Sequence, residues 1–330
     1  MKRIFFIVGP TAVGKSELAA AVAQKVGAEI VSADAFQIYR GLDLLTAKPD
    51  HSTLAKAPHH LIGAVPLSEE MNAENYRATA AQVIDETHGR GKRVIVVGGS
   101  GLYVKALTHG LAKLPEANRK LRDALEQATL DELFRSLLAL DPAGAKQIDR
   151  QNKRRLIRAV EVCLVTGKPF SSQRTQWNQS SAVVAAAVTG GRSEDVAKPN
   201  PLPPVTAAAT TGVLVFRDRA ELYARINRRV EQMFQSGVVE EVRALNNASL
   251  TAGQTLGVAE IREMLAGKIS KPECIAKIQQ ATRRYAKRQL TWFQRQTNFP
   301  ALNLSAHGSS EAIDLISQTP NAFGVSPMDD

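Results

Sequence analysis

Residues Gly9–Ser16 read GPTAVGKS and follow the apolar run Ile4–Val8, which reads IFFIV. They match the pattern G-x4-G-K-[ST], with a predicted strand before the pattern and a predicted helix, 15–26, beginning inside it. Glycines let backbone N–H groups converge on phosphate oxygens, while Lys15 supplies a positive charge and the Ser16 hydroxyl is a ligand for Mg²⁺. We therefore predict a phosphate-binding loop, the P-loop, made of Gly9, Pro10, Thr11, Ala12, Val13, Gly14, Lys15 and Ser16.

Strands and helices alternate through the first third of the chain. Apolar, β-branched runs predict strands at 29–34 and 93–97, and a helical period predicts a helix at 72–90. A further strand is expected at 213–216. This alternation predicts an α/β fold with a doubly wound parallel sheet, like that of the P-loop NTPases. Ligands of such sheets bind at the carboxyl ends of the strands, where the P-loop, Asp34 and Ser100 all fall.

The strand pattern stops near residue 114, and the composition changes again near residue 178. Inside the intervening stretch, periodicity predicts helices near 119–127, 130–140 and 152–165. The segments we expect are a first part of the catalytic core (1–114), an all-helical insertion domain (115–177), a low-complexity linker (178–211), a second part of the core with basic helices (212–306) and an acidic, frayed tail (307–330).

The composition is that of a globular protein with an excess of positive charge. The formal net charge is +10, which favours a polyanionic partner. Cys163 and Cys274 are too far apart in the sequence to form a metal-binding pair, and so few cysteines are typical of a reducing compartment. No apolar run approaches the roughly 20 residues of a membrane span. We expect a cytoplasmic, monomeric protein with no membrane association.

A P-loop alone does not establish ATP binding, because the same loop can hold another nucleotide, a polyphosphate or a pyrophosphate. ATP-binding enzymes usually place an aspartate after a second apolar strand to hold Mg²⁺. Here the strand at 93–97 is followed by Gly98–Gly101, GGSG, whereas Asp34 ends the other strand. Asp34 is a candidate general base; its alternative roles are a helix N-cap or an outer ligand of Mg²⁺. Ser100 is a candidate hydrogen-bond donor to a phosphate bridging oxygen.

Further motifs run in order along residues 3–177 and 212–299: ADAFQIYRGLD (33–43), TAKP (46–49), PHH (58–60), GGSGLY (98–103), RRLIRAVEV (154–162), GKP (167–169), RAELYARIN (219–227), EEV (240–242) and TRRYAKRQLTWF (282–293). With these motifs the chain resembles the tRNA dimethylallyltransferases, which isopentenylate the adenosine 3′ of certain anticodons.

The resemblance implies that the P-loop holds the pyrophosphate of dimethylallyl diphosphate together with Mg²⁺, bound through Ser16. It implies that Asp34 takes the proton from the exocyclic amine of the target adenosine, which is a poor nucleophile because its lone pair is delocalised into the ring. Ser100 stands where the family usually has threonine and is assigned to the reaction centre. Arg219 is expected near the diphosphate.

The resemblance also implies a tRNA-binding surface, and the target base must leave the loop stack to reach the site. Gln37 matches a base-contacting residue of the family, and Arg154 and Arg158 share a helix face at i,i+4 spacing. The full set assigned to tRNA is Asp34, Ala35, Phe36, Gln37, Ser100, Arg122, Arg154, Arg155, Leu156, Ile157, Arg158, Arg284 and Arg288. The sequence departs from the family pattern at 149–152 and at 257–260, which touches tRNA contacts more than the reaction centre.

Three other functions fit parts of the sequence. A P-loop small-molecule kinase would use Asp34 to activate a hydroxyl. An adenylate isopentenyltransferase would act on free nucleotides and would not need the arginine-rich helices. An RNA-binding module would retain the P-loop without using it.

Overall fold

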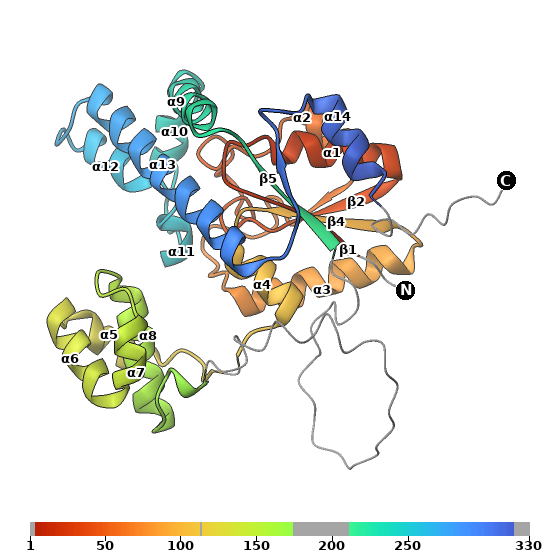
Figure 1. Ribbon diagram of the computed structural model, residues 1–330. Coiled ribbons are helices and arrows are strands. Elements are labelled where there is room, and N and C mark those ends of the chain that lie inside the picture. Colours follow the sequence, from red (N-terminus) through yellow and green to blue (C-terminus); the bar gives the residue numbers. More distant parts are fainter. Residues whose placement is uncertain (1–3, 113, 174–210, 320–330) are drawn as a thin grey trace, which may run out of the picture. The chain divides into compact units, whose positions relative to one another are not determined.

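The computed structural model describes residues 4–112, 114–173 and 211–319. They form two compact units, one made of the chain up to Gly110 together with the described residues from 211 onward, the other of the described residues between 111 and 173 (Figure 1). The linker predicted at 178–211 lies outside the described residues, apart from Thr211. In the described ranges, no helix has both the length and the hydropathy that a bilayer span requires.

The first unit is built on a six-stranded parallel sheet with the strand order β3-β2-β4-β1-β5-β6. This confirms the predicted doubly wound α/β fold. Two strands were missed, β3 and β6, because runs of two and three residues are too short to show a period. The strands are β1 (Ile4–Val8), β2 (Ala28–Ser32), β3 (His59–His60), β4 (Arg93–Gly98), β5 (Thr211–Phe216) and β6 (Ala301–Asn303).

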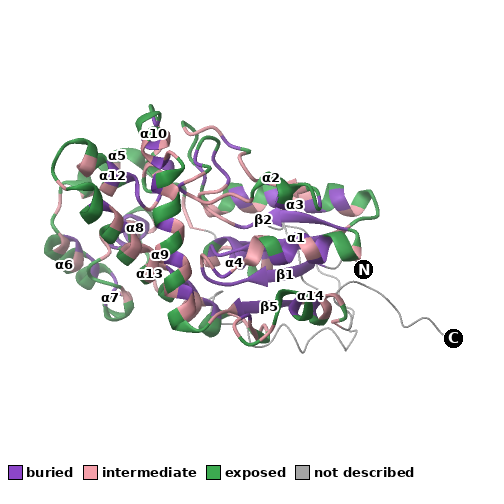
Figure 2. Cartoon of the chain, turned by 90° about the horizontal axis from the view of Figure 1, so that it is seen from above, coloured by how far each residue is buried: buried purple, intermediate pink, exposed green. Residues whose placement is uncertain are grey.

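Helices cover both faces of this sheet. The helices of the first unit are α1 (Lys15–Val26), α2 (His51–Leu54), α3 (Ala73–Gly89), α4 (Gly101–His109), α9 (Arg219–Gln235), α10 (Val238–Arg243), α11 (Leu250–Gly253), α12 (Val258–Leu265), α13 (Lys271–Gln296) and α14 (Ser309–Ser317), of which α10, α11 and α12 stand away from the sheet (Figure 1). Phe6 of β1 packs in the apolar cluster that includes α3 and α4, whereas its neighbour Ile7 packs in the cluster that includes α1 and α14. Figure 2 shows β1 and β2 buried along their whole length. Burial on both sides explains the continuous apolar run of β1.

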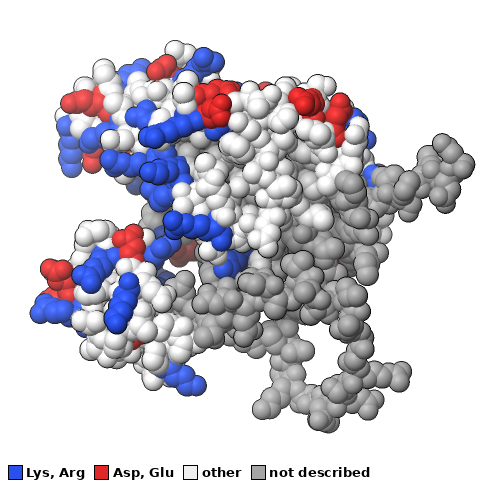
Figure 3. Space-filling model, viewed as in Figure 1, with Lys and Arg blue, Asp and Glu red and all other residues white. Residues whose placement is uncertain are grey.

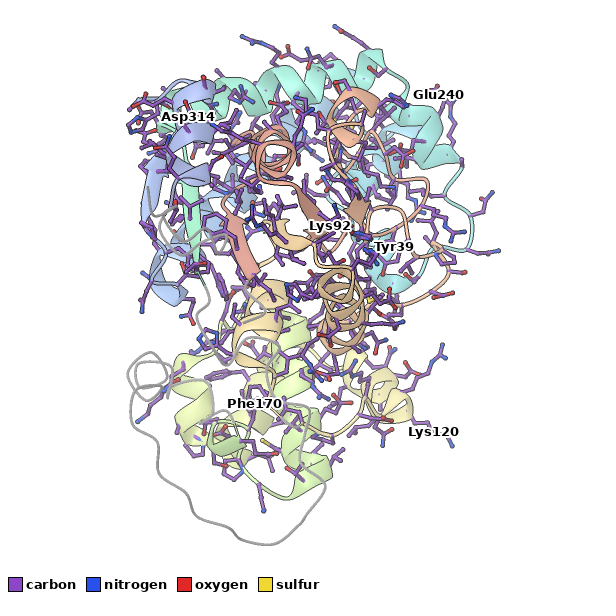
Figure 4. All side chains as sticks on the ribbon, turned by 90° about the vertical axis from the view of Figure 1, so that its right-hand side faces the viewer. Tyr39, Lys92, Lys120, Phe170, Glu240 and Asp314 are labelled. Atoms are coloured by element: carbon purple, nitrogen blue, oxygen red, sulfur yellow. The ribbon has the colours of Figure 1, made fainter. Side chains whose placement is uncertain are left out.

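The acidic tail is folded over its described part, contrary to the sequence prediction. Helix α14 buries Ala312 and Ile316, four residues apart, in the same cluster as α1. Asp314, labelled in Figure 4, forms an ion pair with Lys25 of α1 at 2.5 Å. The acidic composition suggested a frayed end, but two buried apolar side chains on one helix face are enough to dock a short helix.

The regular secondary structure of the second unit is all helix among its described residues. Its helices are α5 (Arg119–Glu126), α6 (Leu130–Leu140), α7 (Pro142–Gln147) and α8 (Lys153–Thr166). Helix α7 was missed because Pro142 and Gly144 obscure its pattern; the Asp141 carboxylate caps it by accepting a hydrogen bond from the Gly144 N–H at 2.8 Å. Asn152, in the stretch that departs from the family pattern, caps α8 by accepting from the Arg155 N–H.

Two residues assigned to tRNA lie in the core of this second unit. Leu156 and Ile157 are 0 % and 3 % exposed and pack with Leu133, Leu137 and Val160. Their side chains cannot reach a ligand while α8 is folded. The prediction is corrected because a basic motif on a helix includes the buried positions between its exposed arginines.

We expect Leu156→Ala to lower the free energy of unfolding of the second unit by about 2–5 kcal/mol, because it removes a fully buried side chain and leaves a cavity. Thermal unfolding followed by circular dichroism measures this loss. Arg155→Ala, on the exposed neighbour, is the control and should change stability by less than about 0.5 kcal/mol. Equal stability of the two variants would contradict the placement of Leu156.

Candidate active site

The P-loop joins the end of β1 to the start of α1. Gly14 is the N-cap of α1 with φ 100°, a left-handed conformation that favours glycine. Behind it, the first N–H groups of α1 have no partner in the helix, and the helix dipole adds partial positive charge at this end. The loop therefore presents backbone donors and the Lys15 side chain to one place, as an anion requires.

Three arginines from the β5–α9 segment donate hydrogen bonds to the P-loop. Arg217 Nε donates to the Val13 carbonyl at 2.9 Å, Arg225 Nε donates to the Ala12 carbonyl at 2.9 Å, and Arg229 Nη1 donates to Thr11 Oγ1 at 3.2 Å. With its carbonyls bound by guanidinium groups, the loop is fixed and surrounded by positive charge.

A cavity of about 480 Å³, the cationic cavity, opens over the P-loop. Lys15, Ser16, Arg225, Arg228 and Arg229 are among its lining residues, and Asp34 lies at its wall. Its size suits a diphosphate group with bound water and a metal ion. With Lys48, five basic side chains line this cavity against the three carboxylates of Glu17, Asp34 and Asp50, and this excess of positive charge favours a polyanionic ligand.

The prediction for Arg219 is corrected by this geometry. Arg219 is the exposed first residue of α9; its guanidinium lies 5.2 Å from the ring centroid of Tyr223, and it lines neither cavity described here. Arg225 and Arg229, one helical turn apart further along α9, reach the P-loop instead. Their i,i+4 spacing is visible in the sequence, but the contact of this face of α9 with the P-loop is not.

Burial disfavours the charged forms of two basic side chains of the cationic cavity. It lowers the pKa of Lys15 to about 8, although the Asp34 carboxylate raises it, and Arg229 lowers it further. Burial likewise lowers the pKa of Arg229 to about 10, again opposed by Asp34. Lys15 Nζ donates to the Pro10 carbonyl at 2.7 Å. An anion in the cavity would add negative charge to that of the lining carboxylates Glu17, Asp34 and Asp50.

Asp34 follows β2 and is fixed by its own turn. Its Oδ1 accepts from the backbone N–H groups of Phe36 at 2.9 Å and Gln37 at 3.2 Å. Ser100, the residue before α4, accepts from the Ala35 N–H at 2.9 Å through its Oγ. The ends of β2 and β4 are thus joined beside the carboxylate. In the free protein the Ser100 hydroxyl orders the Asp34 turn.

A buried amide connects this turn to the P-loop. Gln289 of α13 accepts from the Thr11 N–H through Oε1 at 2.8 Å and donates to the Gly99 carbonyl through Nε2 at 2.9 Å. The approach is possible only because Gly99 and Gly101 lack side chains. A Cβ on Gly99 would lie 2.3 Å from Gln289, and one on Gly101 would lie 2.4 Å from the Trp292 ring. The glycines of GGSG therefore admit α13 to the carboxyl edge of the sheet.

A second cavity, of about 230 Å³, lies beyond Asp34 and is mainly apolar; we call it the apolar cavity. Phe36 and Arg288, both members of the predicted site, line it together with Asp34 and with Tyr285, which was not predicted. The remaining apolar lining comes from Leu45, Ile226, Val230, Met233, Leu256 and Ile278. Thr11, Asp34, Thr46 and Arg229 line both cavities. The Asp34 carboxylate thus lies between a cavity suited to charged groups and a cavity suited to apolar groups.

Gln37 lies in the cationic cavity with its amide orientation determined by its partners. Its Nε2 lies 3.2 Å from the Thr46 carbonyl and 3.1 Å from the Ala47 carbonyl. Carbonyl oxygens only accept hydrogen bonds, so both must receive the two N–H donors of the amide. The Oε1 atom, which has no hydrogen-bond donor among the described residues, is the group left for a ligand.

The arginines of the second unit surround a buried carboxylate. Glu161 is 0 % exposed and accepts from Arg122 Nε at 3.0 Å, from Arg158 Nη1 at 2.7 Å and from the Asn118 N–H at 2.7 Å. These bonds lower the pKa of Glu161 against the opposing effect of its burial. Arg122 and Arg158 thus hold the start of the insertion on α8, while Arg154 and Arg155 are exposed on the same helix.

Basic side chains also gather on the first unit. Figure 3 shows Lys and Arg over α12 and α13, and separately over the second unit. Arg284 is exposed on α13, and the guanidinium of Arg288 lies 5.7 Å from the Tyr285 ring centroid. Positive charge interleaved with an aromatic ring suits contacts with phosphates and unstacked bases.

Comparisons with known proteins agree with this geometry. Residues 37–296 match the family model described as IPP transferase. The chain belongs to the IPP transferase family. It is 38 % identical to a tRNA dimethylallyltransferase of Akkermansia muciniphila, over 93 % of this chain and 96 % of that protein. It is 41 % identical to the tRNA dimethylallyltransferase of Geobacter sulfurreducens, over 89 % of each.

Solved structures show the same fold. A tRNA isopentenylpyrophosphate transferase of Bacillus halodurans superposes with a TM-score of 0.65 at 30 % identity, covering 96 % of this chain and 95 % of that one. A eukaryotic dimethylallyltransferase that acts on tRNA superposes with a TM-score of 0.70 at 24 % identity, covering 94 % and 77 %. That second likeness concerns the fold. The cavities of this IPP transferase-family chain thus lie on a scaffold shared with tRNA-modifying enzymes.

The residues of the cationic cavity fit a magnesium ion bound through a diphosphate. Mg²⁺ favours oxygen ligands, keeps several waters and usually takes one or two protein ligands beside substrate phosphates. Ser16 places a hydroxyl in the cavity, and Asp34 lies at its wall. Among the described residues, no three His, Cys, Asp or Glu side chains lie together so that they could hold a metal ion.

Binding of inorganic pyrophosphate should weaken above about pH 8. Lys15 is charged below its pKa of about 8 and neutral above it, and a bound anion favours the charged form. Titration of Lys15 should therefore leave the affinity unchanged well below pH 8 and lower it by up to tenfold for each pH unit above it, with proton uptake on binding, and ionisation of pyrophosphate adds a further pH dependence that does not involve Lys15. Isothermal titration calorimetry in two buffers of different ionisation enthalpy measures both quantities.

Lys15→Arg is the control, because arginine stays protonated over this range while the ligand titrates identically. Its affinity should show a weaker dependence on pH than the wild type. The same pH dependence in both proteins would contradict the assignment to Lys15.

Proposed function

We propose that this protein transfers a dimethylallyl group from dimethylallyl diphosphate to the exocyclic amine of the adenosine 3′-adjacent to the anticodon of tRNA. One observation carries the proposal: a cationic cavity and an apolar cavity meet at a single carboxylate, Asp34. An allylic diphosphate has a polyanionic half and an apolar half, so it fits this pair of cavities. The tRNA enzymes among its relatives support RNA as the acceptor.

The donor would lie across the boundary between the cavities. Its diphosphate would occupy the cationic cavity against Lys15, Arg225 and Arg228, and its five-carbon chain would point past Asp34. The adenine amine then attacks the first carbon of the chain, the bond from that carbon to the diphosphate oxygen breaks, and the amine proton passes to the Asp34 carboxylate. The positive side chains stabilise the negative charge that develops on the departing pyrophosphate.

Mg²⁺, bound through the Ser16 hydroxyl and the diphosphate, would add positive charge at the leaving group. The protein's own residues would do the rest. The Asp34 turn holds its carboxylate oxygen in place, Ser100 orders that turn, and the apolar cavity limits water around the reacting carbon. Binding of the donor through the P-loop needs no nucleoside triphosphate, and none is consumed in this reaction.

Base recognition would fall to Gln37 and tRNA backbone contacts to the arginines. With its N–H donors used by the Thr46 and Ala47 carbonyls, Gln37 would accept a hydrogen bond from a base amine. Arg154, Arg155, Arg284 and Arg288 would contact phosphates. A monomeric state and a cytoplasmic location remain predictions from the sequence, and gel filtration with multi-angle light scattering tests the first.

The choice of acceptor separates this function from its alternatives. Wild-type protein would be incubated with dimethylallyl diphosphate and Mg²⁺, offered an anticodon stem-loop or free AMP, and the products identified by mass spectrometry of nucleosides. We expect isopentenyladenosine in the stem-loop. Preferential modification of AMP would identify an adenylate isopentenyltransferase, and phosphoryl transfer from ATP that outpaced prenyl transfer would identify a kinase.

Asp34→Asn should lower kcat by about 10²–10⁴-fold, because asparagine cannot take the amine proton. Its side-chain oxygen can still accept from the Phe36 and Gln37 N–H groups, so the turn should persist. Removing the carboxylate also removes charge that opposes an anion, so pyrophosphate should bind at least as tightly as to the wild type. Single-turnover assays and calorimetry measure the two effects. An unchanged rate would reject Asp34 as the base.

Arg154→Ala should weaken tRNA binding and reduce the slope of log affinity against log salt by about one unit, while leaving pyrophosphate affinity unchanged. The reason is that a phosphate contact by one arginine releases about one counterion. Filter binding between low and moderate salt measures the slope. Leu164→Ala, an exposed apolar position on the same helix, is the control. A parallel loss of pyrophosphate affinity would argue against a role restricted to tRNA.

A further inference from the structure

A loop that follows β2 is held by the carboxylate of a residue far along the chain. Glu241 of α10 accepts from the backbone N–H groups of Asp43, Leu44 and Leu45, each at 2.8 Å. Its Oε2 takes the first two and its Oε1 takes the third. Three consecutive amides directed at one charged group make a strong and geometrically specific anchor, because hydrogen bonds to an ionised acceptor are stronger than neutral ones.

The anchored segment, residues 43–48, forms the wall between the two cavities; we call it the 43–48 loop. Thr46 lines both cavities, Leu45 lines the apolar cavity and Lys48 lines the cationic cavity. The loop is also tied internally, since Lys48 Nζ donates to the Tyr39 carbonyl at 2.5 Å and to Asp43 at 2.6 Å. Ala47 has φ 45°, a left-handed conformation that a non-glycine residue seldom adopts without external support.

The carbonyls of this loop orient two side chains of the site. The Thr46 carbonyl accepts from Gln37 Nε2 and from Arg229 Nη2, both at 3.2 Å, and the Ala47 carbonyl accepts from Gln37 Nε2 at 3.1 Å. Arg229 in turn reaches Thr11 of the P-loop. A shift of the loop would therefore move the residue next to the base and a cation next to the diphosphate together.

Resting on the proposed function, we propose that Glu241 is a positioning residue of the prenyl-transfer site, which sets Gln37 and Arg229 on either side of Asp34 by holding the 43–48 loop. Glu241 lines neither cavity, so it acts through the loop and not on the substrate. A carboxylate is required because three donors need two acceptor oxygens. Glutamine offers one oxygen and would turn its own N–H₂ donors toward a backbone N–H.

Glu241→Gln should lower kcat for prenyl transfer to a stem-loop by about 30- to 100-fold, because misplacing reacting groups by about 1 Å can cost about 10²-fold. The affinity for inorganic pyrophosphate should fall much less than kcat does, because Arg229 is displaced while Lys15, Arg225 and Arg228 keep their places. Hydrogen exchange followed by mass spectrometry should show at least about tenfold faster exchange of the amides of residues 43–45. Glu241→Asp, which keeps both oxygens one methylene further away, should give an intermediate loss.

Two controls distinguish positioning from general destabilisation. Glu240→Gln removes a charge from the adjacent residue, which lies on the exposed side of α10 (Figure 4) and pairs only at 3.6 Å with Arg243; it should leave kcat and exchange unchanged. Val242→Ala, a buried position on the same helix, should lower the melting temperature at least as much as Glu241→Gln while keeping kcat within about threefold.

Three results would overturn the proposal. They are an unchanged exchange rate at residues 43–45 in Glu241→Gln, a wild-type kcat despite faster exchange, or an equal kcat loss in Val242→Ala. Failure of the proposed function is distinct from all three, because it would be a wild-type protein with no prenyl transfer. In that case the exchange comparison still decides whether Glu241 holds the loop.

Discussion

The buried amide of Gln289 is the interaction on which the arrangement of the site depends. It joins the Thr11 N–H of the P-loop to the Gly99 carbonyl after β4, two points brought side by side by the parallel pairing of β1 and β4. An amide meets both needs at once, because it has an acceptor and a donor in one plane. Because the glycines on either side of Ser100 have no side chains, α13 can approach the carboxyl edge of the sheet, and with it come Tyr285 and Arg288, which line the apolar cavity.

A balance of charge follows from that arrangement. Asp34 is the carboxylate that raises the pKa of both Lys15 and Arg229, yet burial still lowers both below their usual ranges. In the free protein the cationic cavity is lined by five basic side chains and three carboxylates, so positive charge is in excess there. Under the proposed function, a bound diphosphate would restore the balance, and the same groups would assist its departure as pyrophosphate. The carboxylate is left at the boundary with an apolar cavity, where a proton acceptor is useful to an amine that attacks carbon.

The sequence predicted the parts of the site that are local. The P-loop follows from one continuous pattern, and Asp34 and Ser100 follow from the rule that ligands gather at the carboxyl ends of parallel strands. Gln289 and Glu241 could not be predicted in the same way, because their partners lie 278 and 196 to 198 residues away along the chain. Leu156 and Ile157 were misassigned because a motif does not separate the buried face of a helix from its exposed face. Arg219 was predicted in place of Arg225 and Arg229 because the sequence does not show which part of α9 lies against the P-loop; only the fold determines that.

The most direct test of the central claim is a crystal structure with a non-cleavable thiolo analogue of dimethylallyl diphosphate. We predict that the diphosphate lies in the cationic cavity, in contact with Lys15 and Arg225, and that the five-carbon chain is directed past Asp34 toward the apolar cavity. A diphosphate bound elsewhere, or a chain directed away from Asp34, would contradict it.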